Sequence, residues 1–188
     1  MIKKYEFTGD VKEIDGVKLR RIRAVRDFGM VKAGELGGWL EKEDNLSHEG
    51  SAWVYGSARV YGSANVCDNA TVYGDSRVGG EAEVYGSAKV RGDAEVSDYA
   101  IVCGDAEVCG DAIVESSSDY AVFKNFWSSN RWITYTRSNK MWKAGCFYGT
   151  GEELVKKAYK DSEYKGRCYE ALVRMVEAIE RESTSNNR

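Results

Sequence analysis

Valine occurs at every sixth position from Val54 to Val114, eleven times without a gap. Four residues after each valine comes Ala or Ser, and two residues after it comes Gly, except in the three hexads that have Asp68, Asp98 and Ser116. A spacing of six moves around the surface of an α-helix instead of staying on one face, so this segment is not helical. One short strand and one tight turn per hexad satisfy the pattern, because Val suits strands and Gly suits turns. Such a fixed period is typical of a solenoid.

The pattern resembles that of the hexapeptide-repeat family, whose chains wind into left-handed parallel β-helices. The resemblance implies three hexads per coil, so that residues 18 apart stack and the valines point inward. Residues 36–53 keep the register as one irregular coil, which brings the total to about five. We therefore predict a mainly β fold: a left-handed parallel β-helix over residues 36–123, with a cap at each end.

Both ends of a solenoid expose unpaired strand edges and need a cap. Residues 1–35 are predicted to form an N-terminal β-hairpin cap that turns at Asp15-Gly16, a hairpin signal. Residues 124–188 are predicted to form a small C-terminal α+β module, with aromatic strands at 131–137 and 140–148. A capping box at Thr150 opens a helix to about Asp161, and a second helix covers about 166–182.

The segment DFGMVKAGELGGWL, residues 27–40, resembles the one that precedes the coils in little-characterised β-solenoid proteins of bacteria and phages. Those proteins are named transferases largely because of their fold, which says little about chemistry. Five cysteines without a CxxC pair indicate reduced thiols, and no apolar run reaches the ~20 residues that a membrane helix needs. We expect a cytoplasmic protein of a bacterium or a phage-infected cell, with no membrane partner.

Charge is unevenly distributed along the chain. Residues 48–119 carry 4 Lys and Arg against 13 Asp and Glu, whereas residues 120–188 carry 13 against 8. The acidic solenoid would repel a long polyanion, so we expect no nucleic acid partner. The basic C-terminal module suits a small anion, and its strands carry a group of cations and aromatic rings: Arg131, Trp132, Tyr135, Arg137, Lys140, Trp142 and Lys143.

Alternation in a strand would place Arg131, Ile133, Tyr135 and Arg137 on one face and Trp132 on the other. Aromatic planes beside guanidinium groups suit a ring with an attached phosphate, so the seven residues are our predicted ligand site for a nucleotide-like anion. The alternative is a cap whose aromatic rings close the solenoid and whose cations are solvated.

Candidate catalytic and metal-binding groups are few. Acyltransferases that this fold resembles use a histidine as base, and related carbonic anhydrases use three to hold a metal, but His48 is the single histidine. His48 is either a general base or a substitute for Val at the worn end of the solenoid, and we favour the second. Asp75, Asp93 and Asp111 would stack and could bind a cation, although Asp is also a common turn residue. We predict no catalytic residue, no metal and no cofactor.

Tyrosines on the flat outer faces suggest association, and solenoids of this family commonly form trimers. The predicted interface residues are Tyr55, Tyr61, Tyr73 and Tyr85. Three functions stay open at this point. The first is a non-enzymatic homotrimer that sequesters a small anionic ligand, such as a phage protein that removes a host immune signal. The second is an acyltransferase or nucleotidyltransferase that uses His48, and the third is a purely structural solenoid.

Overall fold

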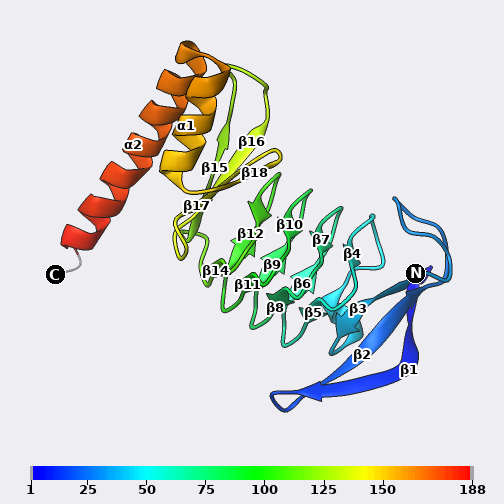
Figure 1. The fold of residues 1–188 in the computed structure, drawn as a ribbon. Coiled ribbons are helices and arrows are strands. Elements are labelled where there is room, and N and C mark those ends of the chain that lie inside the picture. The colour runs from blue at the N-terminus through cyan, green and yellow to red at the C-terminus, as the bar shows by residue number, and fades with distance from the viewer. Residues whose placement is uncertain (1, 187–188) are drawn as a thin grey trace.

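The computed structural model describes residues 2–186 and contains a parallel β-solenoid between two different end structures (Figure 1). Each hexad supplies one two-residue strand that ends in its valine. The strands are β4 (Trp53–Val54), β5 (Arg59–Val60), β6 (Asn65–Val66), β7 (Thr71–Val72), β8 (Arg77–Val78), β9 (Glu83–Val84), β10 (Lys89–Val90), β11 (Glu95–Val96), β12 (Ile101–Val102), β13 (Glu107–Val108) and β14 (Ile113–Val114).

Strands one coil apart pair in parallel, so the coil has three sides. Val54 lies beside Val72, and Val72 beside Val90, which confirms the predicted stacking of residues 18 apart. The eleven valines have no exposed surface, and the small residues four positions later, such as Ala58, are buried beside them. Burying one such side chain contributes about 1.5–3 kcal/mol, so the valine ladder is the main stabilising feature of the solenoid.

The corners explain the exceptions in the repeat. Gly80 has φ +64°, and a Cβ added there would lie 2.6 Å from the backbone nitrogen of Asp98 in the next coil. Asp68 and Asp98 stand where most hexads have Gly, and both adopt the same left-handed conformation, with φ 57° and 54°. Asp tolerates this conformation better than most residues. The corner therefore selects for backbone conformation and for a close approach between coils.

The solenoid has about four coils, where the sequence predicted five. The irregular segment supplies only two of the three sides: β3 (Leu36–Leu40) pairs with β5, and Leu46 forms a bridge with Val66. On the third side β4 is the terminal strand, so nothing pairs with its outer edge. A 3₁₀ helix, Glu43–Asn45, interrupts the segment. The left-handed coil stays a prediction from the family resemblance.

The N-terminal hairpin consists of β1 (Tyr5–Ile14) and β2 (Val17–Ala24), joined at Asp15-Gly16 as predicted. β2 pairs with β3, so the hairpin extends one side of the solenoid into a seven-stranded sheet, β1-β2-β3-β5-β8-β11-β14. The end of the core is closed by aromatic rings, with Trp53 5.3 Å from Phe28 and 6.3 Å from Tyr5 between ring centres. The cap is therefore continuous with the solenoid.

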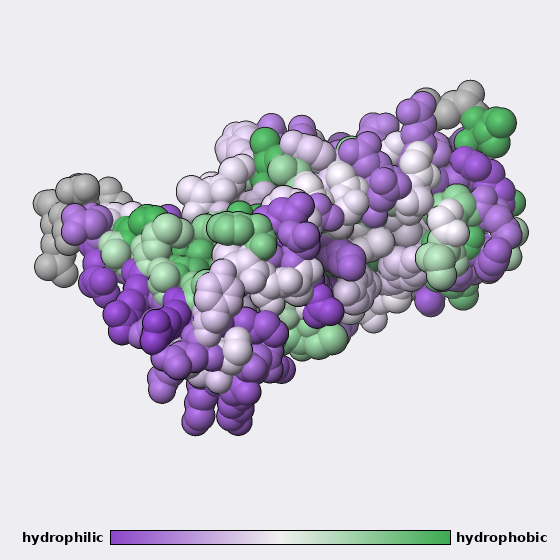
Figure 2. Space-filling view, turned by 90° about the horizontal axis from the view of Figure 1, so that it is seen from above, coloured by the Kyte–Doolittle hydropathy of each residue, from purple (hydrophilic) through white to green (hydrophobic). Residues whose placement is uncertain are grey.

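The C-terminal module is an antiparallel sheet covered by two helices at the opposite end of the molecule (Figure 1). Hydrophilic side chains gather over this helical end in Figure 2. The sheet begins at Tyr120, inside the range expected for the solenoid, and the second helix starts earlier and ends later than predicted. The elements are β15 (Tyr120–Lys124), β16 (Trp132–Thr136), β17 (Met141–Ala144), β18 (Phe147–Gly149), α1 (Gly151–Asp161) and α2 (Glu163–Asn186).

Hydroxyl groups of this module close the last coil. Elsewhere in the solenoid a backbone N–H donates to the carbonyl 17 residues later, as Lys89 does to Ala106. The last coil has no following coil, and on each of its three sides one N–H donates to a side-chain hydroxyl instead. The bonds run from Cys103 N to Tyr120 Oη (3.3 Å), from Glu107 N to Thr134 Oγ1 (3.0 Å) and from Ile113 N to Ser138 Oγ (2.8 Å).

We predict that Thr134→Val destabilises the protein by about 1–3 kcal/mol. The substitution preserves shape and strand preference but leaves the N–H of Glu107 without its acceptor at a site where Thr134 is 2 % exposed. Urea unfolding measures the change. Thr71→Val is the matched control, because Thr71 lies in a strand of the solenoid and forms no side-chain hydrogen bond that we observe. Equal stability of the two variants would contradict the closing role of Thr134.

Candidate functional site

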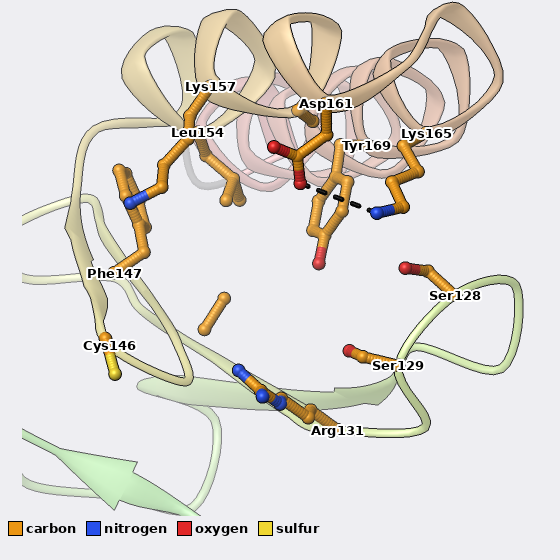
Figure 3. A pocket seen from close by; sticks show the side chains of 12 residues that line it. Ser128, Ser129, Arg131, Cys146, Phe147, Leu154, Lys157, Asp161, Lys165 and Tyr169 are labelled. Carbon is orange, nitrogen blue, oxygen red and sulfur yellow. Dashed lines mark ion pairs between the residues drawn. The ribbon is translucent and has the colours of Figure 1, made fainter.

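A pocket of about 320 Å³ lies between the C-terminal sheet and the two helices, and we call it the sheet–helix pocket. Figure 3 shows Arg131 on the sheet side, facing Lys157 and Lys165 on the helix side. Four elements contribute to its wall: the loop before β16, the end of the sheet at β17 and β18, α1 and α2. The lining residues are Ser128, Ser129, Arg131, Ala144, Cys146, Phe147, Leu154, Lys157, Ala158, Asp161, Lys165 and Tyr169.

Two cations come from the helices. α1 presents Leu154 and Ala158 to the core, so Lys157, between them on the helix surface, reaches the rim of the pocket. Its Nζ lies 5.7 Å from the centre of the Phe147 ring. Lys165, in the first turns of α2, lies 3.5 Å from the Asp161 carboxylate. This pair is solvent-exposed and contributes little to stability, so a ligand could compete for Lys165 at small cost.

The third cation, Arg131, depends on a glycine. Gly145 has φ +60°, and a Cβ added there would lie 2.7 Å from Nη1 of Arg131. The turn between β17 and β18 therefore needs Gly both for its backbone conformation and to leave room for the guanidinium. With Arg131, Lys157 and Lys165 against Asp161, the pocket has an excess of two positive charges. Its chemistry suits an anion.

A hydrogen-bonded loop fixes the remaining polar groups. Asn125 is 1 % exposed, and its side-chain Nδ2 donates to the hydroxyl of Tyr169 at 2.7 Å and to Ser129 Oγ at 3.3 Å. Its backbone N–H donates to the carbonyl of Arg131. Because Tyr169 accepts from Asn125, its own O–H proton is free to donate, and its oxygen points into the pocket in Figure 3. Burial raises the pKa of Tyr169, so it stays a neutral donor.

The structure distributes six of the seven predicted ligand residues over three places. Arg131 lines the sheet–helix pocket, and with Trp132 and Lys143 it also lines a second cleft, against the solenoid, which we call the junction cleft. Tyr135, Lys140 and Trp142 line a third hollow beside α2.

Burial decides what these residues can do. Tyr135 and Trp142 are 5 % and 2 % exposed and pack with Ile133 in the core under the helices. Arg137 donates to Glu180 of α2 at 2.8 Å. The rings and this cation hold the module together under the helices, whereas the cap considered as the alternative had rings that close the solenoid and solvated cations.

Lys143 and Trp132 face the solenoid. Lys143 is 8 % exposed; its Nζ donates to the carbonyl of Gly145 and lies 3.6 Å from Glu107 of β13. Trp132 is 42 % exposed and lies under the ammonium group of Lys124, at 5.2 Å. Lys143 is therefore engaged at the junction, and Trp132 offers an open ring face beside it.

The predicted interface tyrosines lie in different surroundings. Tyr55 and Tyr73 line an open hollow of about 440 Å³ on one flat face. Tyr61 lies in a cavity beneath the hairpin, and Tyr85 lies close to Cys103, whose thiol raises its pKa. Only the face with Tyr55 and Tyr73 presents two of these rings together.

His48 is locked into the N-terminal cap. Its Nδ1 accepts a hydrogen bond from the backbone N–H of Lys4 at 3.3 Å, its Nε2 lies 2.8 Å from Glu43 Oε1, and its ring stacks on Tyr5. Nδ1 therefore has no proton, and Nε2 carries the one that it donates to Glu43. The side chain is 9 % exposed. Both ring nitrogens are engaged in structure, so no lone pair faces a substrate.

Lys4, beside His48, is buried without a carboxylate partner that we observe. Its Nζ donates to the carbonyl of Glu49 at 3.1 Å and lies 5.2 Å from the Phe28 ring. Burial, followed by the charge of Arg26, lowers the pKa of Lys4 from 10.5 to about 8. Between pH 8 and 10.5 Lys4 is protonated in the unfolded chain and neutral in the folded chain. Its contribution to the free energy of unfolding therefore increases as the pH rises.

We compare the free energy of unfolding of Lys4→Met with that of the native chain at two pH values. We predict that the variant's advantage is greater at pH 7 than at pH 10.5 by about 3 kcal/mol. The methionine removes the buried charge, whereas the other ionisations are common to both chains and cancel. Urea unfolding of both proteins at the two pH values provides the measurement. A difference that does not change with pH would contradict the lowered pKa.

Several pocket residues were missed by the sequence analysis. Phe147 and Lys157 were assigned to a strand and a helix of the C-terminal module. Ser128 and Ser129 fell before the first predicted strand, and Lys165 fell between the two predicted helices. One signal was available, since Lys157 falls between the apolar positions Leu154 and Ala158 and must lie at the edge of the buried helix face. Nothing in the sequence places that edge opposite Arg131.

Comparison with known proteins adds limited information. No family model matches the chain. A segment of 45 residues, 22% of the chain, is 47% identical to an Escherichia coli K12 protein named "Uncharacterized acetyltransferase YdcK" and covers 14% of that protein's length.

The described residues contain neither a membrane-spanning helix nor a cluster of metal ligands. Between residues 2 and 186, no helix is long and apolar enough to cross a membrane. Nor does this part of the chain contain a cluster of three His, Cys, Asp or Glu side chains that could hold a metal ion. Asp111, one of the stacked aspartates, instead accepts a hydrogen bond from Asn139 at 3.0 Å.

The repeat, the parallel coils and the matched segment agree: the chain is a β-solenoid built from hexapeptide repeats.

Proposed function

We propose that this protein binds a small anionic, nucleotide-like ligand in the sheet–helix pocket and holds it without turnover. The observation that carries the proposal is the convergence of Arg131, Lys157 and Lys165 on one pocket that contains a single carboxylate, Asp161. The volume of about 320 Å³ is within the range of small-molecule sites. Charge-assisted hydrogen bonds from these groups suit a phosphate.

The remaining wall suits the rest of such a ligand. Phe147, Leu154 and Ala158 give an apolar surface on which a ring could lie, and Ser128 and the Tyr169 hydroxyl add neutral donors. The other cavities fit an anion less well. The junction cleft contains Asp105 and Glu107 beside its cations, and the hollow beside α2 contains Glu177 and Glu180 beside Lys140 and Arg181.

The proposal of binding without chemistry is supported by the state of His48. A general base needs a free lone pair within reach of its substrate, and both ring nitrogens of His48 have partners in the cap. His48 also bonds to Lys4 of the N-terminal cap, whereas the sheet–helix pocket is lined by residues of the C-terminal module.

Acetyl transfer is the second candidate, because the matched E. coli protein carries that name. The match covers too little of either protein to transfer an activity. In this alternative acetyl-CoA would bind, its acetyl group would pass to an amine or hydroxyl of an acceptor, and CoA would be released as the thiol. The two functions therefore differ in whether the bound molecule is recovered intact. A purely structural solenoid, the third possibility, would bind none of these molecules.

We predict that Arg131→Gln and Lys157→Gln each weaken binding about tenfold or more, since each removes a charged donor from the anion. Titration calorimetry would measure affinity for AMP, ADP, cyclic nucleotides, ADP-ribose, CoA and acetyl-CoA. Chromatography of the mixture after incubation would test whether the bound compound is unchanged.

Lys160→Gln is the matched control, since it removes the same charge from α1 at an exposed position outside the pocket. Its affinity should stay within twofold of the native value. Equal binding by the native chain and Lys157→Gln would refute the site. Formation of free CoA and an acetylated acceptor from acetyl-CoA and an amine acceptor, lost in His48→Gln, would refute binding without turnover and support the transferase.

Sequestration gives this binding a biological use. A protein that captures a host immune signal for a phage needs tight binding and many copies, and no catalytic group. A homotrimer supplies three pockets per particle, and the face with Tyr55 and Tyr73 is the proposed subunit contact.

We predict a trimer in solution, with a mass near three times 21.0 kDa by multi-angle light scattering. Tyr73→Arg should give a monomer. Each subunit would then bring a positive charge to the contact face, where the charges would repel one another and pack poorly against the Tyr55 ring. Tyr99→Arg, at a tyrosine that is 74 % exposed, is the control and should leave the trimer intact. A monomeric native protein would remove the proposed assembly without affecting the pocket.

A further inference from the structure

A second cavity lies between the N-terminal hairpin and one side of the solenoid, and we call it the hairpin cavity. Its volume is about 260 Å³. One wall comes from the hairpin and is apolar except for Asp15 at the turn, whereas the other is polar and comes from the outer face of β5, β8 and β11. The lining residues are Ile14, Asp15, Val17, Leu19, Arg59, Tyr61, Arg77 and Glu95.

The polar wall is a ladder of neighbouring side chains with too few carboxylates. Register places Trp39 beside Arg59, Arg59 beside Arg77, and Arg77 beside Glu95. Glu95 forms an ion pair with Arg77 at 3.5 Å. Arg59 is thus next to a like charge, an arrangement that destabilises a sheet. Its neighbour on the other side, Trp39, cannot neutralise it.

More positive charge lies beyond Trp39. Lys12 Nζ lies 4.1 Å from the centre of the Trp39 ring, and the Arg21 guanidinium carbon lies 5.6 Å from it. Burial lowers the pKa of Lys12, and the charges of Arg59 and Arg21 lower it further. Arg59 therefore has cations on both sides. Asp15, the other carboxylate of the cavity wall, forms no ion pair with Arg59 in the described chain.

The guanidinium of Arg59 also contains an unsatisfied donor. Its Nε is buried and has no hydrogen-bond partner among the described residues. A charged donor that is shielded from water without a partner lowers stability, so Arg59 keeps its place in the sheet at an energetic cost. Tyr61 is a second donor here. Its ring lies flat over Gly79, where an added Cβ would come within 2.5 Å of it, and burial keeps the hydroxyl protonated by raising its pKa.

We infer that the hairpin cavity binds a small organic anion with an apolar part. A carboxylate or phosphate group would lie against the terminal nitrogens of Arg59, where it would relieve the repulsion from Arg77. The apolar part would lie on Val17 and Leu19, and the Tyr61 hydroxyl would complete the polar side. This site shares no lining residue with the sheet–helix pocket.

The test uses inorganic phosphate and phenyl phosphate as probes, with chloride at equal ionic strength as reference. It is performed in the Arg131→Gln background, which weakens the other anion site. We expect both probes to raise the melting temperature, phenyl phosphate more than phosphate because its ring covers apolar surface. Adding Arg59→Met should weaken phenyl phosphate binding about tenfold or more. Met keeps most of the apolar stem of Arg and removes the charge.

Lys18→Met is the matched control, because Lys18 lies on the same hairpin strand between Val17 and Leu19 and points to the exposed face. It should leave phenyl phosphate binding within twofold. The ligand-free Arg59→Met protein should melt above its parent, because an unpaired charge has been removed. Equal responses of the Arg59→Met and Lys18→Met proteins to phenyl phosphate would overturn the inference, and so would the absence of any response in the parent.

Discussion

The backbone N–H groups of the last coil are the constraint on which the rest of the structure depends. Every coil of a parallel solenoid satisfies its donors with the carbonyls of the next one, so the final coil has nothing to donate to. Hydroxyls of Tyr120, Thr134 and Ser138 take this place, one on each side of the prism. Strand β16 must lie across the end of the solenoid to deliver Thr134, and the C-terminal sheet follows from that requirement.

The sheet creates a second problem, whose solution creates the pocket. With one face of β16 turned to the solenoid, Ile133 and Tyr135 on the other face need a cover, and α1 and α2 supply it. Helices cover a flat sheet incompletely near its edge. At that edge the side chain of Arg131 extends from the sheet and that of Lys157 extends from the helix. Both border a space that no core side chain fills.

Local rules in the sequence predicted much of this arrangement. The spacing of Val and Gly gives the coil, Asp15-Gly16 gives the hairpin, and the Thr150 capping box gives the start of α1. Strand alternation also separates Tyr135 from Trp132 correctly. Alternation does not say what covers each face of the strand. We therefore took the seven predicted ligand residues as one site, although their side chains lie on opposite faces of the sheet. The number of coils was overestimated for a similar reason. Residues 36–53 keep the spacing of the repeat, but they form only two of the three sides of a coil.

Regularity itself explains where chemistry can lie in such a molecule. A coil that repeats every 18 residues makes flat faces, on which neighbouring side chains differ little and no space is enclosed. Enclosed space requires an element that crosses the repeat, and in this chain only the hairpin and the C-terminal module do so among the described residues. The sheet–helix pocket and the hairpin cavity both occur at such crossings, and Arg59 shows the cost: a ladder position is filled by a like charge where Glu or Thr would be more stable. The regular coils thus supply the stability, and the enclosed spaces in which we propose binding occur where another element crosses them.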